Sequence, residues 1–282
     1  AFTGRRQIEN TGLVGEYRYA GGAFDFSAAV RHDINDRFAD ETTFRVGAGY
    51  ALTDTTRLRA SAGTGTKNPG FFELFGFVDG TFIGNEDLTP EKSTSWEVGV
   101  DQGFADGAVR VSLTYFDSEL EDEIFTTFPA PTFIATPANR DTVSTQRGVE
   151  IAIAADLGSG FSFNSAYSYL DAEEDGVEEV RRPDEIASAA LSWTAPDDAG
   201  GITLVVRYNG ETPDLAFTDP SFVPVRETLD DYTLVNINAR VRLSEGVGLF
   251  ARAENLFDTQ YEQVFSFVSP GQSIIAGIEA RF

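Results

Sequence analysis

The stretch SIIAGIEARF, Ser273–Phe282, ends the chain and alternates two kinds of side chain along its whole length. Because successive side chains of a β-strand point to opposite faces of a sheet, this alternation predicts a strand with one apolar face. Its apolar positions are Ile274, Ala276, Ile278, Ala280 and Phe282. Ends of domains usually fray and carry polar residues. A large aromatic that keeps the register to the last position therefore indicates a terminal strand that is paired along its full length.

The same period of two recurs along nearly the whole chain, whereas helical periodicity is almost absent. In the segment FRVGAGYAL, for example, Phe44 and Val46 share one face and Arg45 lies on the other. We count about thirteen such segments. We therefore predict an all-β fold of antiparallel strands, in one domain that spans residues 1–282.

The connections between these segments alternate in length. Short turn-like stretches such as AGGA and LSEG alternate with long connections at roughly 33–43, 65–92, 118–145, 171–184, 210–231 and 257–273. Structureless loops longer than about 12–15 residues are uncommon in compact soluble domains. Outer-membrane barrels, in contrast, have short turns at one end and long loops at the other. The alternation therefore favours a transmembrane β-barrel over a β-sandwich.

The sequence alone does not fix whether the apolar faces point to a dry core, as in a soluble sandwich, or to lipid. Three features favour lipid: the length of several strands, an opposite face rich in Arg and Glu, and aromatic residues near strand ends. These aromatic residues are Tyr17, Tyr19, Trp96, Tyr115, Tyr167, Tyr169, Trp193 and Tyr208. Since an unpaired strand edge is not tolerated in lipid, the last strand has to pair, and we expect Phe282 to take part in barrel closure and assembly.

Composition excludes several classes of function. The chain has no Cys and a single His, which removes thiolate and His-pair metal sites and most His-based catalysis. Its formal net charge of −24 argues against nucleic acid as a partner. No acid–base pair, serine elbow or metal triad stands out. We therefore predict neither an enzyme nor a cofactor or metal site.

Four motifs, spread over much of the chain, are similar to those of a known family. They are TGTKNPGFFELFG (Thr64–Gly76), GNEDLTPEKSTSWEVGV (Gly84–Val100), QRGVEI (Gln146–Ile151) and ENLFDTQY (Glu254–Tyr261). In this order they resemble the signature segments of the TonB-dependent outer-membrane receptors. The spacing around RHDINDRFADETTFRVGAGY is most similar to that of the cobalamin receptors, and catecholate siderophore receptors share much of it.

The resemblance implies a 22-stranded barrel that encloses an N-terminal plug domain. This chain would then supply the C-terminal part, about thirteen strands, and the plug finds no match in it. An odd number of strands does not by itself close a single-chain bacterial barrel. The resemblance also implies a bacterial outer-membrane location and three partners: membrane lipid, a small nutrient and the inner-membrane TonB complex, which would act through the missing plug.

The function implied is active transport of a scarce nutrient, either cobalamin or a ferric siderophore. Acidic loops disfavour a strongly anionic ligand. The alternative is a non-transporting barrel subunit that acts as a scaffold or assembly partner. A soluble lectin-like sandwich is a third reading.

Two groups of loop residues are the candidates for ligand contact. The stretch FFELFGF places Phe71, Phe72, Phe75 and Phe77 in a long polar connection, where exposed aromatics need a cover. That cover is either the plug or the ligand. Asn139 and Arg140, before the strand that begins near Val149, are the second group. The acidic stretch DAEEDGVEEVRR comes close to a calcium loop but has Arg182 where a bidentate Glu is required.

Overall fold

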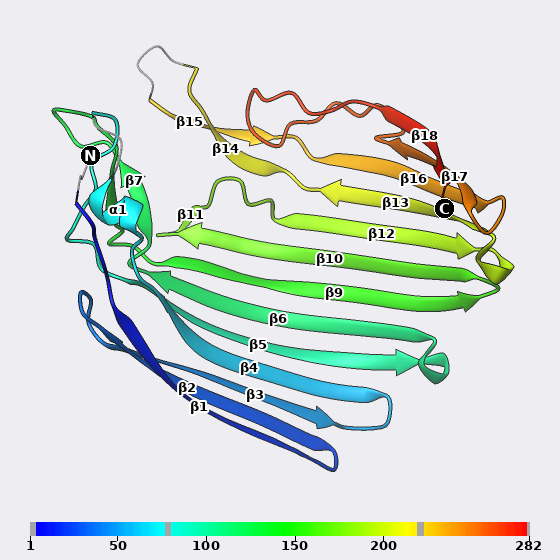
Figure 1. Ribbon diagram of the computed structural model, residues 1–282, viewed down its shortest axis with the longest axis horizontal. Helices are drawn as coiled ribbons and strands as arrows, with labels where there is room; N and C mark the ends of the chain where they lie inside the picture. The colour runs from blue at the N-terminus through cyan, green and yellow to red at the C-terminus, as the bar shows by residue number, and fades with distance from the viewer. Residues whose placement is uncertain (1–3, 77–79, 219–222, 281–282) are drawn as a thin grey trace.

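The computed structural model describes residues 4–76, 80–218 and 223–280. Thirteen strands follow one another in chain order in a single sheet, and the short β11 pairs with β10 beside this path. All neighbouring pairs, from β1–β2 to β17–β18, are antiparallel. The prediction of about thirteen antiparallel strands is therefore confirmed. Figure 1 shows that the sheet curves into an open trough, with the longer connections gathered at one end.

The thirteen strands in chain order range from 8 to 15 residues, longer than the mean of about 5–6 in globular proteins. They are β1 (Asn10–Gly21), β2 (Phe24–Asn35), β3 (Glu41–Ala51), β4 (Thr56–Lys67), β5 (Glu91–Phe104), β6 (Val109–Glu121), β9 (Ser144–Gly158), β10 (Phe161–Glu174), β12 (Glu185–Thr194), β13 (Gly200–Asn209), β16 (Tyr232–Arg242), β17 (Val247–Glu254) and β18 (Ser273–Ala280).

The connections contain short elements of their own. These are α1 (Phe71–Phe75), β7 (Ile124–Thr127), β8 (Thr136–Asn139), β11 (Val177–Glu178), β14 (Thr212–Ala216) and β15 (Val225–Leu229), with 3-10 turns η1 (Ala105–Gly107) and η2 (Pro196–Asp198). Pairs β7–β8 and β14–β15 are separate two-stranded hairpins. Within the described part of the chain, no helix has both the length and the apolar content needed to cross a membrane.

Five of the six long connections expected from the sequence are present at the loop end of the sheet. The exception is the one expected at 33–43, because β2 continues to Asn35 and β3 begins at Glu41, so that only residues 36–40 connect them. The Asn35 side chain accepts hydrogen bonds from the backbone N–H groups of Arg37 and Phe38, both at 2.9 Å, and holds this connection in a tight turn. Such local side-chain caps shorten a loop that composition alone marks as long.

The sheet is a single layer, and the described residues have no core between two sheets. The five buried hydrophobic residues belong to the connections or to strand ends beside them: Leu74, Leu88, Ala172, Ala216 and Leu229. Ile278, on the last strand, is 71% exposed. A soluble sandwich would bury its apolar face between two layers, so that reading is wrong.

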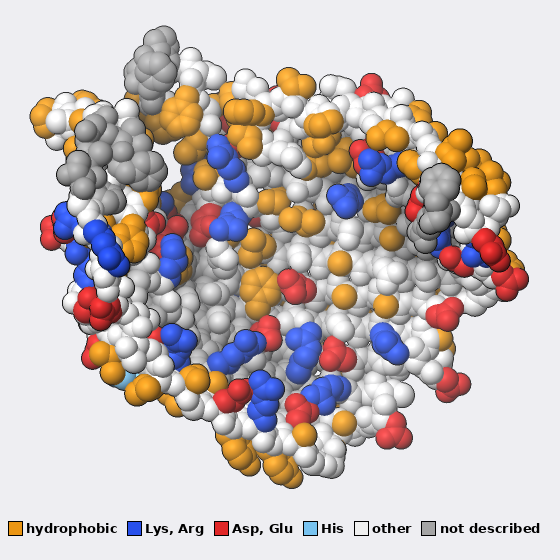
Figure 2. Space-filling view, viewed as in Figure 1, with side chains coloured by type: hydrophobic (Ala, Val, Ile, Leu, Met, Phe, Trp, Pro, Cys, Tyr) orange, Lys and Arg blue, Asp and Glu red, His pale blue; other side chains and the backbone are white. Residues whose placement is uncertain are grey.

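The two faces of the sheet differ in chemistry from one edge to the other. On the outer face, apolar side chains continue across the strands in register, as in the row Leu191, Leu204 and Ile237. The inner face carries ion pairs, including Arg57 with Asp25. Figure 2 shows Arg, Lys, Asp and Glu side chains gathered inside the hollow of the sheet and hydrophobic side chains along its rim. Broad exposed apolar surface of this kind marks contact with a membrane or with another protein.

Aromatic pairs lie at both ends of the apolar band. At the loop end, Trp96 and Tyr115 pack with ring centroids 5.3 Å apart. At the turn end, Phe161 and Trp193 lie 6.3 Å apart. Two such girdles mark the water interfaces of transmembrane barrels.

The terminal strand β18 pairs with β17 along its full length, from Ser273 to Ala280. Phe282 itself lies outside the described residues, so its role in barrel closure stays a prediction.

Candidate functional site

Helix α1 presents the first group of candidate residues at the loop end. Leu74 is fully buried and anchors the helix, whereas Phe71 is 46% and Phe72 is 40% exposed. Phe72 stacks on Phe82 with ring centroids 4.1 Å apart. Gly84 allows this packing, because a Cβ there would lie 2.4 Å from the backbone carbon of Phe75. The helix therefore displays two aromatic rings on a fixed support.

Two guanidinium groups lie close to the ring of Phe75. Arg6 is 4.7 Å and Arg37 is 5.2 Å from the centroid of its ring. Arg37 also contacts Glu86 at 3.3 Å. These cation–π contacts join the N-terminal segment and two connections into one aromatic surface, which we define as Phe71, Phe72 and Phe75 with Arg6 and Arg37. Phe77, the fourth aromatic candidate, lies outside the described residues.

Asn139 connects two long connections of the loop end. Its Oδ1 accepts a hydrogen bond from Thr89 N at 2.9 Å. Its Nδ2 donates to Thr89 O at 3.0 Å and to Asp122 O at 2.6 Å. The side-chain amide thus satisfies backbone groups that would otherwise be unpaired. Contact between Asn139 and a ligand stays a prediction.

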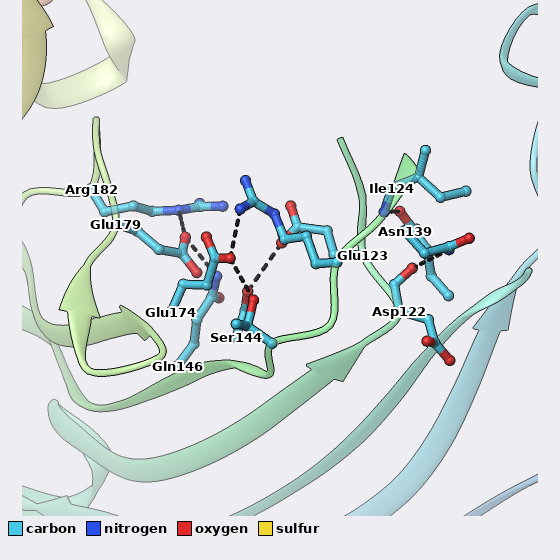
Figure 3. Close-up of polar contacts among 12 residues, drawn as sticks. Asp122, Glu123, Ile124, Asn139, Ser144, Gln146, Glu174, Glu179 and Arg182 are labelled. Carbon is cyan, nitrogen blue, oxygen red and sulfur yellow. Dashed lines mark hydrogen bonds and ion pairs between the residues drawn. The ribbon is translucent and has the colours of Figure 1, made fainter. Parts of the chain in front are cut away.

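Arg140 belongs to a charged cluster beside Asn139. Its Nη1 donates to Glu174 at 2.6 Å, its Nε lies 3.5 Å from Glu123, and its guanidinium stacks 4.4 Å from the centroid of Phe125. Ser144 donates to the same Glu123 carboxylate at 3.0 Å. Figure 3 shows Glu123, Ser144 and Glu174 converging at the start of β9. Arg140 is therefore held among protein groups, and its predicted contact with a ligand is untested.

Glu91, from the second sequence motif, holds the ends of two strands together. Only 7% of it is exposed. Its Oε2 accepts from Lys67 at 2.9 Å, and its Oε1 accepts from the backbone N–H of Ile124 at 2.9 Å. Lys67 belongs to the first motif, so the two motifs meet in space. Both act here as supports of the loop end.

The buried carboxylate of Asp214 joins its own connection to two others. Its side chain has no exposed surface. Oδ1 accepts from Arg181 Nε at 2.8 Å and from Leu215 N at 2.8 Å, and Oδ2 accepts from Phe265 N at 2.7 Å. Arg181 N also donates to Pro213 O at 2.6 Å. We call this set the Asp214 clasp.

Hydrogen bonding determines the charge state of the Asp214 carboxyl group. Burial alone would raise the pKa of Asp214, but the N–H groups of Phe265 and Leu215 and the Arg181 guanidinium outweigh that effect and lower it. Asp214 is therefore ionised at neutral pH. Sequence reasoning missed Asp214, since one Asp in an acidic connection gives no signal.

The motif ENLFDTQY forms the tight exit from β17. Asn255, at φ +46°, accepts from Thr259 N at 2.8 Å and donates to Thr259 O at 2.9 Å. Tyr261 packs on Tyr232 with ring centroids 4.5 Å apart. This motif is thus a compact Asx-type turn that directs the following connection back over β16.

A curved single-layer sheet with an apolar exterior, aromatic girdles and a structured loop end defines a segment of transmembrane β-barrel wall. The family model described as "TonB dependent receptor-like, beta-barrel" matches residues 1–256. The chain therefore belongs to the family of TonB-dependent receptor β-barrels, which are bacterial outer-membrane proteins.

Curated relatives and solved structures agree with this assignment. The chain is 29% identical over 262 residues to the vitamin B12 transporter BtuB of Vibrio vulnificus, covering 90% of this chain and 40% of the relative. The BtuB protein of Photobacterium profundum is 28% identical over 260 residues, with the same coverage. The siderophore receptor PirA of Acinetobacter baumannii superposes with a TM-score of 0.81 at 16% identity, over 98% of this chain and 46% of that one.

A further similar structure is the ferripyoverdine receptor of Pseudomonas aeruginosa, with a TM-score of 0.77 and 18% identity, over 97% of this chain and 38% of that one. Identities this low establish the shared fold only. The chain spans about 40% of the length of the curated relatives it matches, so it is a partial barrel.

Proposed function

We propose that this chain forms part of the barrel of a receptor that takes up a scarce nutrient across the outer membrane, and that this nutrient is a cobalamin. The observation that carries the proposal is the 29% identity to a vitamin B12 transporter over 90% of the chain. That match spans the strands and also the connections that build the loop end. The siderophore receptors share the fold at lower identity, and ferric chelates are therefore the second ligand class to test.

Electrostatics favours a cobalamin over a ferric chelate as the ligand. The chain carries a formal net charge of −24, and acidic residues are frequent in the connections at the loop end. A field of this sign slows the approach of strongly anionic ferric chelates and leaves a weakly charged corrinoid unaffected. The aromatic surface offers flat apolar area suited to a large ring system.

The remaining parts of the proposal follow from the family. Residues 1–282 form one barrel portion, which lies in the outer membrane and acts as a transporter rather than an enzyme, as the relatives named above are transporters and receptors. The inner-membrane TonB complex supplies energy through a plug domain outside these residues. The loops bind the nutrient first, and the nutrient then passes through the barrel.

The test uses the full-length gene product. Purified receptor in detergent is titrated with cyanocobalamin, with a ferric catecholate and with ferripyoverdine. Saturable binding of cyanocobalamin alone, and energy-dependent uptake of labelled cyanocobalamin by cells that lack any other cobalamin receptor, are the expected results. Deletion of TonB in the same cells should abolish uptake and leave binding intact.

Binding of a ferric chelate without cobalamin would move the receptor to the siderophore class. Binding of none of the three probes would favour the scaffold alternative.

A further inference from the structure

A small polar cavity lies where strands β2, β3 and β4 reach the loop end. Its volume is about 210 Å³, and its lining includes Asn10, Arg31, Asp33, Asn35, Glu41 and Thr66. A water molecule occupies about 30 Å³ of liquid volume. The cavity therefore has room for several waters or for one polar side group of a larger ligand.

Asn35 aims an unused donor into this cavity. Its Oδ1 accepts from the backbone N–H groups of Arg37 and Phe38, which fixes the orientation of the amide. Nδ2 is then forced to the opposite side, where it is buried and has no hydrogen-bond partner among the described residues. The hydroxyl of Thr66 is buried and unpaired in the same way. Buried polar atoms are nearly always paired, so two unpaired atoms at one cavity indicate a ligand group or ordered water.

The charged groups at the cavity are already neutralised by one another. Arg31 donates to Asp33 at 2.6 Å, and Asn10 donates to the same carboxylate at 3.0 Å. Glu41 is paired with Lys92 at 2.8 Å. A ligand carboxylate would be repelled by the Asp33 and Glu41 oxygens, and an ammonium group could not accept the hydrogen bond that Asn35 Nδ2 offers. A carboxamide suits the site, because its oxygen accepts from Asn35 and its NH₂ donates to a carboxylate.

The residues that line the cavity are close in sequence to those of the aromatic surface. The Asn35 cap positions Arg37, whose guanidinium contacts the ring of Phe75. On the other side, Thr66 lies five residues before Phe71, the first residue of α1. A ligand with a flat ring system and polar side groups would use both features together.

We infer that this cavity is a subsite for a carboxamide side group of the bound nutrient. The inference rests on the proposed function, since corrinoids carry carboxamide groups around the ring. It adds to that function a polar contact with Asn35 and Thr66 that determines ligand specificity.

The test compares three variants of the full-length receptor. Asn35→Asp keeps the oxygen that caps Arg37 and Phe38 but replaces the donor with a charged acceptor. Thr66→Val removes the hydroxyl at nearly constant volume. Asn164→Asp, on the inner face of β10, adds the same charge at a distance from the cavity and is the matched control. Each is titrated with cyanocobalamin and with its monocarboxylic acid derivatives, in which one carboxamide has become a carboxylate.

Losing one buried hydrogen bond weakens affinity by about 3- to 10-fold, and facing the ligand oxygen with a carboxylate weakens it further. We expect Thr66→Val to weaken cyanocobalamin binding about 5-fold, Asn35→Asp at least 10-fold and Asn164→Asp less than 2-fold. One of the monocarboxylic acids should bind wild type less tightly than cyanocobalamin does, and should bind Asn35→Asp more weakly still because two carboxylates then face each other.

Wild-type affinity in both Asn35→Asp and Thr66→Val would overturn the subsite and leave the proposed function standing. A wild-type receptor that does not bind cyanocobalamin would overturn both. Heat-modifiable migration of each variant, compared with wild type, checks that the barrel has folded.

Discussion

Replacing Asp214 with alanine removes the carboxylate that joins three connections at the loop end. The carboxylate is fully buried and accepts from Arg181, Leu215 and Phe265 at 2.7–2.8 Å. Arg181 is half exposed and will be rehydrated in the variant. The N–H groups of Leu215 and Phe265 lose their acceptor at a partly buried position.

The magnitude follows from these contacts. Hydrogen bonds to a charged acceptor contribute about 1.5–3 kcal/mol each, so the two backbone bonds together contribute about 3–5 kcal/mol. The bond to Arg181 adds little, because exposed ion pairs are screened by solvent. This loss acts on local opening of the connections and not on the whole barrel, whose strands keep their pairing. A loss of about 3–5 kcal/mol corresponds to a rise of roughly 10²- to 10⁴-fold in the rate of amide hydrogen exchange.

Hydrogen exchange with mass spectrometry on the full-length receptor measures this effect. We expect faster exchange in three separate stretches, at 177–184, 212–216 and 262–268, with β10 and β13 unchanged. Asp230→Ala is the control, since Asp230 lies in the same connection, carries the same charge and is exposed. Faster exchange in only one of the three stretches, or an equal effect of Asp230→Ala, would refute the idea that the Asp214 clasp couples them.

The clasp also predicts a pH dependence. The folded-state pKa of Asp214 is lowered, so its contribution is complete above the unfolded-state value of about 3.9 and is lost as pH falls through the folded-state pKa. Protection of the three stretches, corrected for intrinsic exchange, should be constant from about pH 6 to pH 8 and should fall below about pH 4. Protection lost near pH 6 would show that another group controls the clasp.

Three further substitutions test the fold and the loop end. Leu204→Lys, on the outer face, should destabilise the receptor in liposomes by about 2–4 kcal/mol in urea unfolding, whereas Thr203→Lys on the inner face should change it little. Gly148→Val should lower the folded yield, because a Cβ would lie 2.1 Å from the backbone oxygen of Tyr169; normal folding would disprove this close approach. Asn139→Asp should raise proteolysis of connections 68–90 and 122–143 through repulsion of two backbone oxygens, and unchanged proteolysis would contradict its role as a structural link.

The strand content of this protein could be predicted from the sequence because each strand is paired with its neighbour in the chain. Alternating side chains such as Leu204 and Thr203 record the two faces locally, and short turns record where the chain reverses. The five-residue turn at 36–40 was mispredicted as part of a long connection, because its cap at Asn35 depends on two specific hydrogen bonds and leaves no trace in periodicity.

The loop end shows the opposite situation. Asp214, Arg181 and Phe265 come from three connections, separated by tens of residues, and no repeat relates them. Phe71 and Phe72 were singled out correctly as exposed aromatics. That Asn139 and Arg140 are engaged by other protein groups was visible only once the connections were packed together.

By itself, the amino-acid sequence determined the approximate number of strands in the main sheet, their order, the chemistry of their two faces and the family. Those properties depend on hydrogen bonding between adjacent strands and on the period of two, both of which act over short distances along the chain. Tertiary structure alone decided which face is concave, how the connections are tied to one another and where an unpaired donor such as Asn35 Nδ2 is left. These depend on packing between segments far apart in the chain, for which local patterns carry no information.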